Sequence, residues 1–230
     1  MMLASFAPAA HAVVIGSRGA IGAAFADALA ANPGFALVTR LARPELDLTD
    51  AASIAAAAAA LPAPPDLVIV ATGILHGDGL KPEKSLRDLD AAALARSFAI
   101  NAIGPALVAQ AFLPLLPIGR KTVFAALSAR VGSISDNRLG GWHAYRAAKA
   151  ALNQLIRTLA IEQTRRNPDS IVLALHPGTV DSPLSLPFQR GVATLFPPAV
   201  AAGQLLAVID AATPAQSGRL FDWRGDEIAP

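Results

Sequence analysis

The stretch that decides the fold is His11-Ala-Val-Val-Ile-Gly16-Ser-Arg-Gly19-Ala-Ile-Gly22, near the start of the chain. Residues 13–15 are continuously apolar and β-branched, which is typical of a parallel strand with both faces buried. Residues 20–31 form an alanine-rich segment that we expect to be helical. A glycine turn between a buried strand and a helix N-terminus lets backbone N–H groups approach a phosphate. The stretch predicts a nucleotide-binding unit, although a glycine-rich turn without a ligand has the same composition.

The alternation of strand and helix continues to the end of the chain. Further strands are expected at residues 35–40, 67–71, 122–127, 171–175 and 219–223, and the run at 67–71 is typical of a buried strand. Helices are predicted at residues 51–60, 90–112, 142–166 and 198–211. This order indicates an α/β fold, in which right-handed crossovers place helices on both faces of a parallel sheet. Ligands of such sheets bind beyond the carboxyl ends of the strands.

The composition excludes several classes of protein. The chain has 230 residues, of which 53% are hydrophobic and 16% charged, so we expect residues 1–230 to form one folded domain. The absence of cysteine excludes disulfides, thiolate metal sites and a cysteine nucleophile. The four histidines lack a metal-binding spacing, and no basic run is interleaved with aromatic residues, so neither a metal nor a nucleic acid is expected. Neither a membrane span nor a leader is evident, which favours a cytoplasmic protein without a membrane partner.

The residues after the second strand indicate which dinucleotide the chain prefers. An acidic residue there would accept hydrogen bonds from an adenosine ribose, but this chain has Arg40, with Arg43 close behind and Arg18 inside the glycine turn. A guanidinium group is a natural partner for a 2′-phosphate, so we expect NADP rather than NAD. The alternative is that these arginines lie in solvent.

Tyr145 and Lys149 are the candidate proton-transfer pair. Their spacing of four residues puts both side chains on one face of the predicted helix. A nearby ammonium group lowers the pKa of a phenol, which makes Tyr145 a usable acid and base near neutral pH. The same spacing is common on solvated helix faces, but Tyr145 is the single tyrosine of the chain and follows a Ser/Gly-rich loop.

Six features in order make the chain resemble the short-chain dehydrogenase/reductase superfamily. They are the glycine turn, Asp47, Ala71-Thr72-Gly73, Asn101, the Tyr145/Lys149 pair and Pro177-Gly178-Thr179-Val180. The segment from Ser128 to Arg146 is similar to the C-factor-like branch, which includes sniffer-type carbonyl reductases. The resemblance implies a Rossmann-type, doubly wound, seven-stranded, mostly parallel sheet. It also implies an NADP-dependent oxidoreductase that acts on a small or medium carbonyl or alcohol substrate.

The resemblance implies a role for each matching residue. Tyr145 would exchange a proton with the substrate oxygen, Lys149 would hold the nicotinamide ribose, and Asn101 would position a water behind Lys149. Asp47 would contact the adenine, and Val180 would bond the carboxamide through its backbone. The implied cofactor-binding set is Gly16, Ser17, Arg18, Ala20, Ile21, Gly22, Arg40, Asp47, Leu48, Ala71, Thr72, Gly73, Tyr145, Lys149, Pro177, Gly178 and Val180.

Three positions depart from the family pattern. The middle glycine of the turn is Gly19, one residue early, and Ala71-Thr72-Gly73 replaces Asn-Ala-Gly and so lacks an amide that pins neighbouring strands. Ala129 stands where the catalytic serine usually lies. Ser128 is our first candidate for that role, since a bulge at the strand end could turn it toward the site. Ser133 is the second candidate, and the third possibility is that no serine acts.

Residues 181–190 predict a short substrate lid. Leu184, Leu186 and Phe188 suggest an apolar substrate face, although such residues also pack against neighbours. We expect structural or packing roles for His143, Trp142 and Trp223, and we expect His176 to satisfy a backbone bond rather than bind a metal. Two further alternatives stay open, a catalytically weak signalling protein that binds NAD(P) and, more weakly, an epimerase or dehydratase. The resemblance also implies a homodimer or homotetramer, formed through the helices at 90–112 and 142–166.

Overall fold

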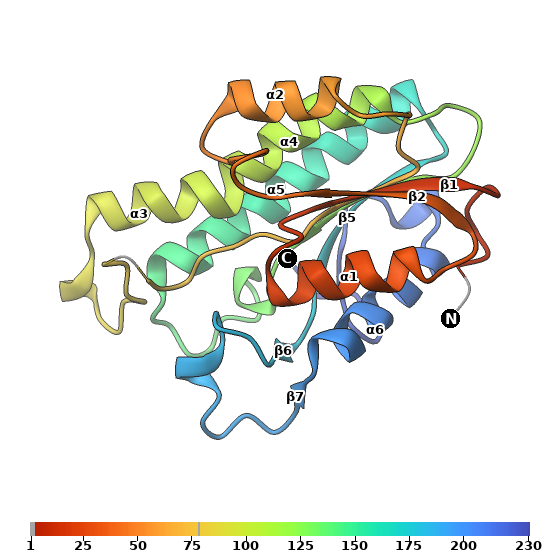
Figure 1. Ribbon diagram of the computed structural model, residues 1–230. Coiled ribbons are helices and arrows are strands. Elements are labelled where there is room, and N and C mark those ends of the chain that lie inside the picture. Colours follow the sequence, from red (N-terminus) through yellow and green to blue (C-terminus); the bar gives the residue numbers. More distant parts are fainter. Residues whose placement is uncertain (1–2, 78) are drawn as a thin grey trace.

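A six-stranded parallel sheet runs through the middle of the computed structural model, which describes residues 3–77 and 79–230 (Figure 1). Its strand order is β2-β1-β3-β4-β5-β8, and every neighbouring pair is parallel. The strands are β1 (Ala10–Ile15), β2 (Phe35–Leu41), β3 (Leu67–Val70), β4 (Thr122–Leu127), β5 (Ser170–His176) and β8 (Leu220–Asp222). Two short strands, β6 (Thr179–Val180) and β7 (Leu195–Phe196), pair separately.

Helices cover both faces of the sheet, as the alternating pattern predicts (Figure 1). One face carries α1 (Ala20–Ala30) and α6 (Pro198–Ala211), and the other carries α2 (Ala51–Ala59), α4 (Gly104–Phe112) and α5 (His143–Arg166). A further helix, α3 (Ala91–Phe98), precedes α4. Short 3₁₀ turns lie at Leu86–Asp88, Leu113–Leu115, Arg130–Gly132, Leu186–Phe188 and Pro214–Gln216. Alternate residues along each strand face two separate apolar cores, which explains why the strands read as continuous apolar runs.

The strand count corrects one expectation. The six strands that the apolar runs predict are all present, but the seventh strand implied by the resemblance does not form in the described residues. Residues 42–50 are all that separate β2 from α2. A parallel strand needs a crossover of about a dozen residues or more, so this link is too short to hold another helix and strand. Small β6 and β7 stay outside the main sheet.

The helix predicted at 90–112 is continuous but contains an irregular turn. Residues Ala99–Ile103 form a π-helical turn between α3 and α4, and this turn carries Asn101. Such turns are frequent at functional sites because they change which face of the helix a side chain occupies. By length and composition the stretch Ala91–Leu115 could cross a membrane, a property that core helices share. Here it packs on one side against α5 and α2.

Candidate active site

A cleft of about 740 Å³ opens at the carboxyl ends of β1 and β3, where a doubly wound sheet binds its ligands. Its volume suits a small molecule or cofactor. Seven residues of the expected cofactor-binding set line it: Gly16, Arg18, Asp47, Leu48, Ala71, Thr72 and Gly73. The other lining residues are Ile15, Gly19, Ala42, Arg43, Leu46, Thr49, Ile74, Arg96, Ala99 and Ile100.

The glycine turn forms one wall of this cleft with bare backbone. Gly16 has a φ of +84°, and a Cβ there would lie 2.8 Å from the Ala71 carbonyl oxygen. A Cβ at Gly22 would collide with the Gly16 carbonyl, so α1 packs directly on the turn. α1 begins after Gly19 with neither a side-chain cap nor an acidic residue in its first turn. Its N–H groups are therefore available to an anion, and they fit a pyrophosphate group.

The expected arginines divide into two groups. Arg18 and Arg43 line the cleft, and the Arg18 guanidinium donates to the Arg43 carbonyl oxygen at 2.6 Å. Arg40 does not line it, because its guanidinium pairs at 2.7 Å with Asp27 on α1. Asp47 also lines the cleft, and bonds from the Thr49 N–H and hydroxyl lower the pKa of its carboxyl. The guanidinium groups at this end of the cleft are thus those of Arg18 and Arg43.

The strand β3 leads into a segment held by Asn101. The buried Asn101 side chain accepts from the Ile74 N–H at 3.0 Å and donates to the Ile74 carbonyl at 2.8 Å. A Cβ at Gly73 would lie 3.2 Å from Asn101 Oδ1 and 3.7 Å from Lys149 Nζ, so Gly73 leaves room where these side chains converge. Thr72 Oγ1 is buried without a partner, consistent with the loss of the strand-pinning amide.

Tyr145 and Lys149 lie on one face of α5, as their spacing predicts. Lys149 is buried, donates from Nζ to the Leu127 carbonyl at 2.7 Å, and lies 5.7 Å from the centre of the Tyr145 ring. Burial lowers the pKa of Lys149 to about 7 and raises the pKa of Tyr145 to about 12. The expected decrease in the tyrosine pKa is wrong for the protein alone, because desolvation of the phenolate outweighs attraction to the ammonium group.

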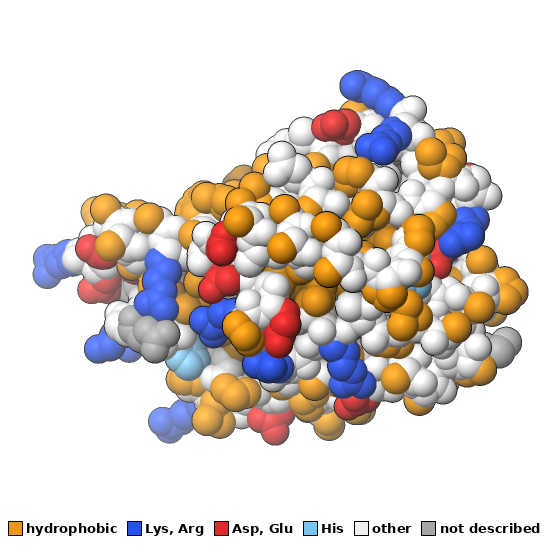
Figure 2. All heavy atoms as spheres, turned by 45° about the horizontal axis from the view of Figure 1, so that its top comes forward, with side chains coloured by type: hydrophobic (Ala, Val, Ile, Leu, Met, Phe, Trp, Pro, Cys, Tyr) orange, Lys and Arg blue, Asp and Glu red, His pale blue; other side chains and the backbone are white. Residues whose placement is uncertain are grey.

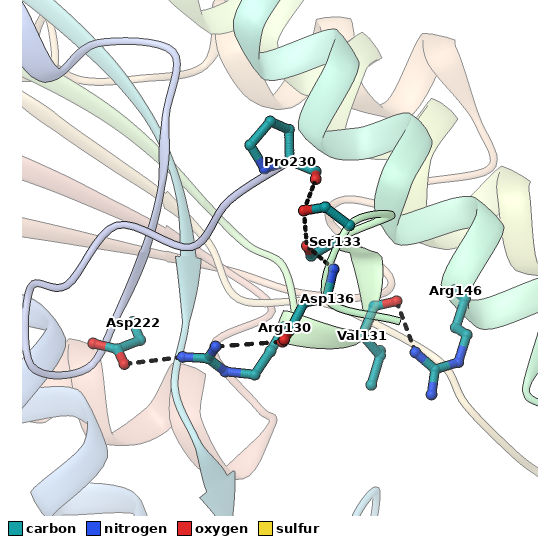
Figure 3. A network of polar contacts seen from close by, with 8 residues as sticks. Arg130, Val131, Ser133, Asp136, Arg146, Asp222 and Pro230 are labelled. Atoms are coloured by element: carbon teal, nitrogen blue, oxygen red, sulfur yellow. Dashed lines mark hydrogen bonds and ion pairs between the residues drawn. The ribbon is translucent and has the colours of Figure 1, made fainter. Parts of the chain in front are cut away.

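Both candidate serines have their hydroxyl groups engaged. Ser128 donates to Asn153 Oδ1 at 2.6 Å, about two helical turns along α5 from Tyr145. Ser133 accepts from the Asp136 N–H at 3.1 Å (Figure 3). The choice among Ser128, Ser133 and no serine stays a prediction.

A polar network holds the segment that follows β4 (Figure 3). The Arg130 guanidinium pairs with Asp222 at 3.3 Å and Asp136 at 3.4 Å, and Arg146 donates to the Val131 carbonyl. His176 lies beside this network, where burial and the Arg130 charge lower its pKa to about 4. Its Nδ1 is buried without a partner, so this atom does not make the expected backbone bond.

The predicted lid begins after Pro177, Gly178 and Val180, which follow β5 and do not line the described cleft. Gly178 has a φ of +73°, and a Cβ there would lie 2.9 Å from the Phe196 ring and 3.1 Å from Trp223. The remaining members of the expected cofactor set, Ser17, Ala20, Ile21 and Gly22, belong to the turn and first turn of α1, behind the lining residues.

Glu83 is a structural residue that the sequence analysis missed. Its side chain is only 3% exposed, accepts from the Ala144 N–H at 3.2 Å, and leaves Oε1 without a partner. Its backbone carbonyl accepts from the Trp142 N–H at 2.6 Å. Glu83 therefore caps α5 immediately before Tyr145. The available signal was the predicted helix start, where tryptophan offers no capping oxygen and an outside acceptor is required.

The sequence of the chain is similar to those of several known proteins. A family model described as enoyl-(acyl carrier protein) reductase matches residues 5–195. The C-signal of Myxococcus xanthus is 41% identical over 145 residues, which cover 63% of this chain and 82% of that protein. A 1-hydroxy-2-glutathionyl-2-methyl-3-butene dehydrogenase of Rhodococcus sp. (strain AD45) is 34% identical over 176 residues, or 76% of this chain and 74% of that one.

Solved structures have the same fold. The NADPH-bound carbonyl reductase from chicken fatty liver superposes with a TM-score of 0.81 at 25% identity, over 97% of this chain and all of that chain (100%). The carbonyl reductase Sniffer of D. melanogaster superposes with a TM-score of 0.80 at 19% identity, again over 97% and 100%. The second likeness supports the fold alone.

Proposed function

The chain belongs to the short-chain dehydrogenase/reductase superfamily of NAD(P)-dependent oxidoreductases, and on that premise we propose which reaction it performs. It transfers hydride between NADP and the carbon of a small or medium carbonyl or alcohol substrate, while Tyr145 transfers the proton. The observation that carries this proposal is the convergence of Lys149 and Asn101 on Gly73, with Tyr145 beside Lys149. Residues 1–230 act as one domain in this proposal.

The cleft residues fit a dinucleotide. The uncapped N-terminus of α1 and the bare turn at Gly16 would hold the pyrophosphate, and Asp47 would lie at the adenine. Arg18 and Arg43 supply the positive charge that a 2′-phosphate requires, and Arg40 joins them only if it leaves Asp27. The NADPH-bound carbonyl reductase from chicken supports the same choice of cofactor. When bound, NADPH supplies the hydride.

In the reducing direction, the carbonyl carbon accepts hydride and its oxygen accepts the Tyr145 proton, which yields an alcohol. Lys149 has a pKa of about 7, so its amino group can gain and lose a proton near neutral pH behind the phenol. Asn101 commits its side chain to Ile74, so we assign it a positioning role toward the water behind Lys149. Ser128 is our first candidate for polarising the carbonyl, a role that requires it to release Asn153.

We also propose a homodimer or homotetramer in the cytoplasm, without a nucleic-acid or membrane partner. The outer faces of α4 and α5 form a mostly apolar groove, which a second copy could cover; it is lined by Ala106, Leu107, Ala109, Gln110, Leu113, Pro114, Leu159 and Glu162. On the face drawn in Figure 2, basic and acidic side chains are interspersed rather than gathered by sign. A sedimentation mass equal to one 23.5 kDa chain would contradict the oligomer.

Oxidation of NADPH across a panel of aldehydes and ketones tests the proposal. We expect turnover on some members, with the consumed NADPH matched by alcohol formed. A second candidate function, a catalytically weak signalling protein, is favoured by the likeness to the C-signal of Myxococcus xanthus and by Ala129 at the usual serine position. Tight NADP binding without turnover on any member would support that alternative.

A further inference from the structure

Four rings form a continuous series between the lid and the proposed proton donor. His76 contacts Phe188 at 5.6 Å between ring centres, Phe188 contacts Trp142 at 4.9 Å, and Trp142 contacts Tyr145 at 6.3 Å. All three contacts are edge-to-face, with interplanar angles of 67°, 62° and 73°. These residues come from three separate segments, since Trp142 and Tyr145 both lie at the start of α5, and the tertiary fold brings the series together beside Tyr145.

His76 fixes the lid end of this series. Its Nε2–H donates to the carbonyl oxygens of Pro183 at 3.1 Å and Leu184 at 3.0 Å. Two residues earlier, Ile74 is bonded through both backbone groups to the buried Asn101 side chain. His76 therefore stands on a segment anchored to the π-helical turn, and it holds the lid turn that carries Phe188.

Trp142 is fixed by its backbone rather than by burial of its ring. Its φ is +51°, a left-handed conformation that L residues rarely adopt, and its N–H donates to the Glu83 carbonyl at 2.6 Å. Glu83 in turn caps Ala144. The indole is half-buried and turns toward Phe188 and Tyr145, which is more specific than the packing role expected from the sequence.

We propose that Trp142 and Phe188 determine substrate specificity. They form an aromatic wall beside Tyr145 that favours carbonyl substrates with a planar aromatic group next to the carbonyl, and His76 is the positioning residue that sets Phe188. A planar ring gains edge-to-face contacts with both side chains, whereas a saturated ring of the same size gains only apolar burial. This inference rests on the proposed function and names its substrate class.

The first test compares kcat/KM for benzaldehyde and cyclohexanecarbaldehyde, which differ in aromaticity at equal ring size. We expect Phe188→Leu to lower the ratio of kcat/KM for benzaldehyde to that for cyclohexanecarbaldehyde about three- to tenfold. The different intrinsic reactivities of the two aldehydes do not affect this change, because the same two substrates are compared in both enzymes. The matched control is Phe196→Leu, because Phe196 lies in β7, just after the lid, and contacts Trp223 edge-to-face at 4.7 Å rather than the ring series. An unchanged ratio in Phe188→Leu, or an equal fall in both variants, would overturn the proposal.

The role of His76 is tested by separating its hydrogen bonds to the lid carbonyls from its ring contact with Phe188. His76→Gln retains an N–H donor for the lid carbonyls, whereas His76→Leu loses it. As a positioning residue, His76 should act on KM for benzaldehyde rather than on kcat, and His76→Gln should restore most of the ratio that His76→Leu loses. A fall in kcat for both substrates alike, without a change in their ratio, contradicts this role.

A binding measurement keeps the inference separate from catalysis. The chain has two tryptophans, so Trp223→Phe leaves Trp142 as the single reporter. With NADP present, benzamide should quench its fluorescence at concentrations about three- to tenfold below those at which cyclohexanecarboxamide does. Quenching by both amides at equal concentrations overturns the aromatic wall even if turnover is found. Selective quenching without turnover on any carbonyl supports the wall and rejects the proposed reaction instead.

Discussion

The glycine-turn end of the site and the Tyr145 end lie at the same edge of the sheet, but they are built from different material. At the first, backbone dominates, since glycines and an uncapped helix N-terminus form the wall. At the second, side chains dominate, and Lys149, Asn101 and Glu83 are each fixed by bonds to distant backbone. A site built from backbone tolerates few substitutions but can be predicted from a short stretch of sequence. A site built from side chains depends on contacts made by the whole fold.

The largest effect should come from Tyr145→Phe, which removes the proton donor and leaves the backbone site intact. We expect kcat to fall about 10²- to 10⁴-fold, as is usual for loss of a general acid. NADP affinity, measured by titration of NADPH fluorescence, should stay within about twofold of the starting protein. A parallel loss of NADP affinity would break the separation between the two ends.

Titration of Lys149 should appear in the pH dependence of stability. Its pKa is about 7 in the folded chain and near 10.5 when unfolded, so the unfolded state binds more protons between these values. The free energy of unfolding should therefore rise with pH above 7, by about 2 kcal/mol between pH 7 and 9. Urea titrations at the two pH values measure this, and Lys149→Met should lose the rise. The same slope in both proteins would mean that Lys149 stays charged.

Gly16→Ala probes the backbone end. A Cβ at φ +84° and 2.8 Å from the Ala71 carbonyl oxygen should cost about 1–3 kcal/mol in unfolding free energy. NADP affinity should fall at least tenfold, while the pH-dependent rise from Lys149 should persist. Gly203→Ala is the matched control, because nothing lies within 4 Å of a Cβ there and the residue is helical. Equal losses in both variants would contradict a local steric cause.

The smallest expected effect is on dinucleotide affinity, and it compares Arg43, which lines the cleft, with Arg40, which does not. Arg43→Ala should weaken NADP binding about tenfold and leave NAD binding nearly unchanged, since only NADP carries the 2′-phosphate. Arg40→Ala should change either affinity less than threefold, because Arg40 is paired with Asp27. Isothermal titration with both dinucleotides gives the comparison. A larger loss in Arg40→Ala than in Arg43→Ala would show that Arg40 leaves Asp27 to bind the phosphate.

Local pattern was sufficient for most of the fold. All six strands of the sheet were predicted, most plainly the central ones, because burial on both faces favours continuous apolar runs there. The helix at 198–211 has the predicted bounds, and that at 142–166 begins one residue later at His143. The expectation of a seventh strand came from the family resemblance and not from a strand pattern in the residues. The short link at 42–50 leaves no room for such a strand.

The π-helical turn at Ala99–Ile103 could not be predicted, since the apolar pattern around it continues with ordinary helical spacing. The pKa of Tyr145 was expected in the wrong direction for a similar reason. Sequence spacing places an ammonium group near the phenol but does not report how strongly desolvation in the folded chain opposes ionisation of the phenol.

The sequence by itself determined the strand–turn–helix at residues 11–22, the parallel sheet and the pairing of Tyr145 with Lys149 on one helix face, because each follows from contacts within a few residues. Only the tertiary structure decided that Arg43 rather than Arg40 lines the cleft, that Glu83 caps α5 across 61 residues, and that His76 holds the lid across 107 residues. Such contacts join segments whose approach is set by the packing of the whole sheet, and no local periodicity carries that information.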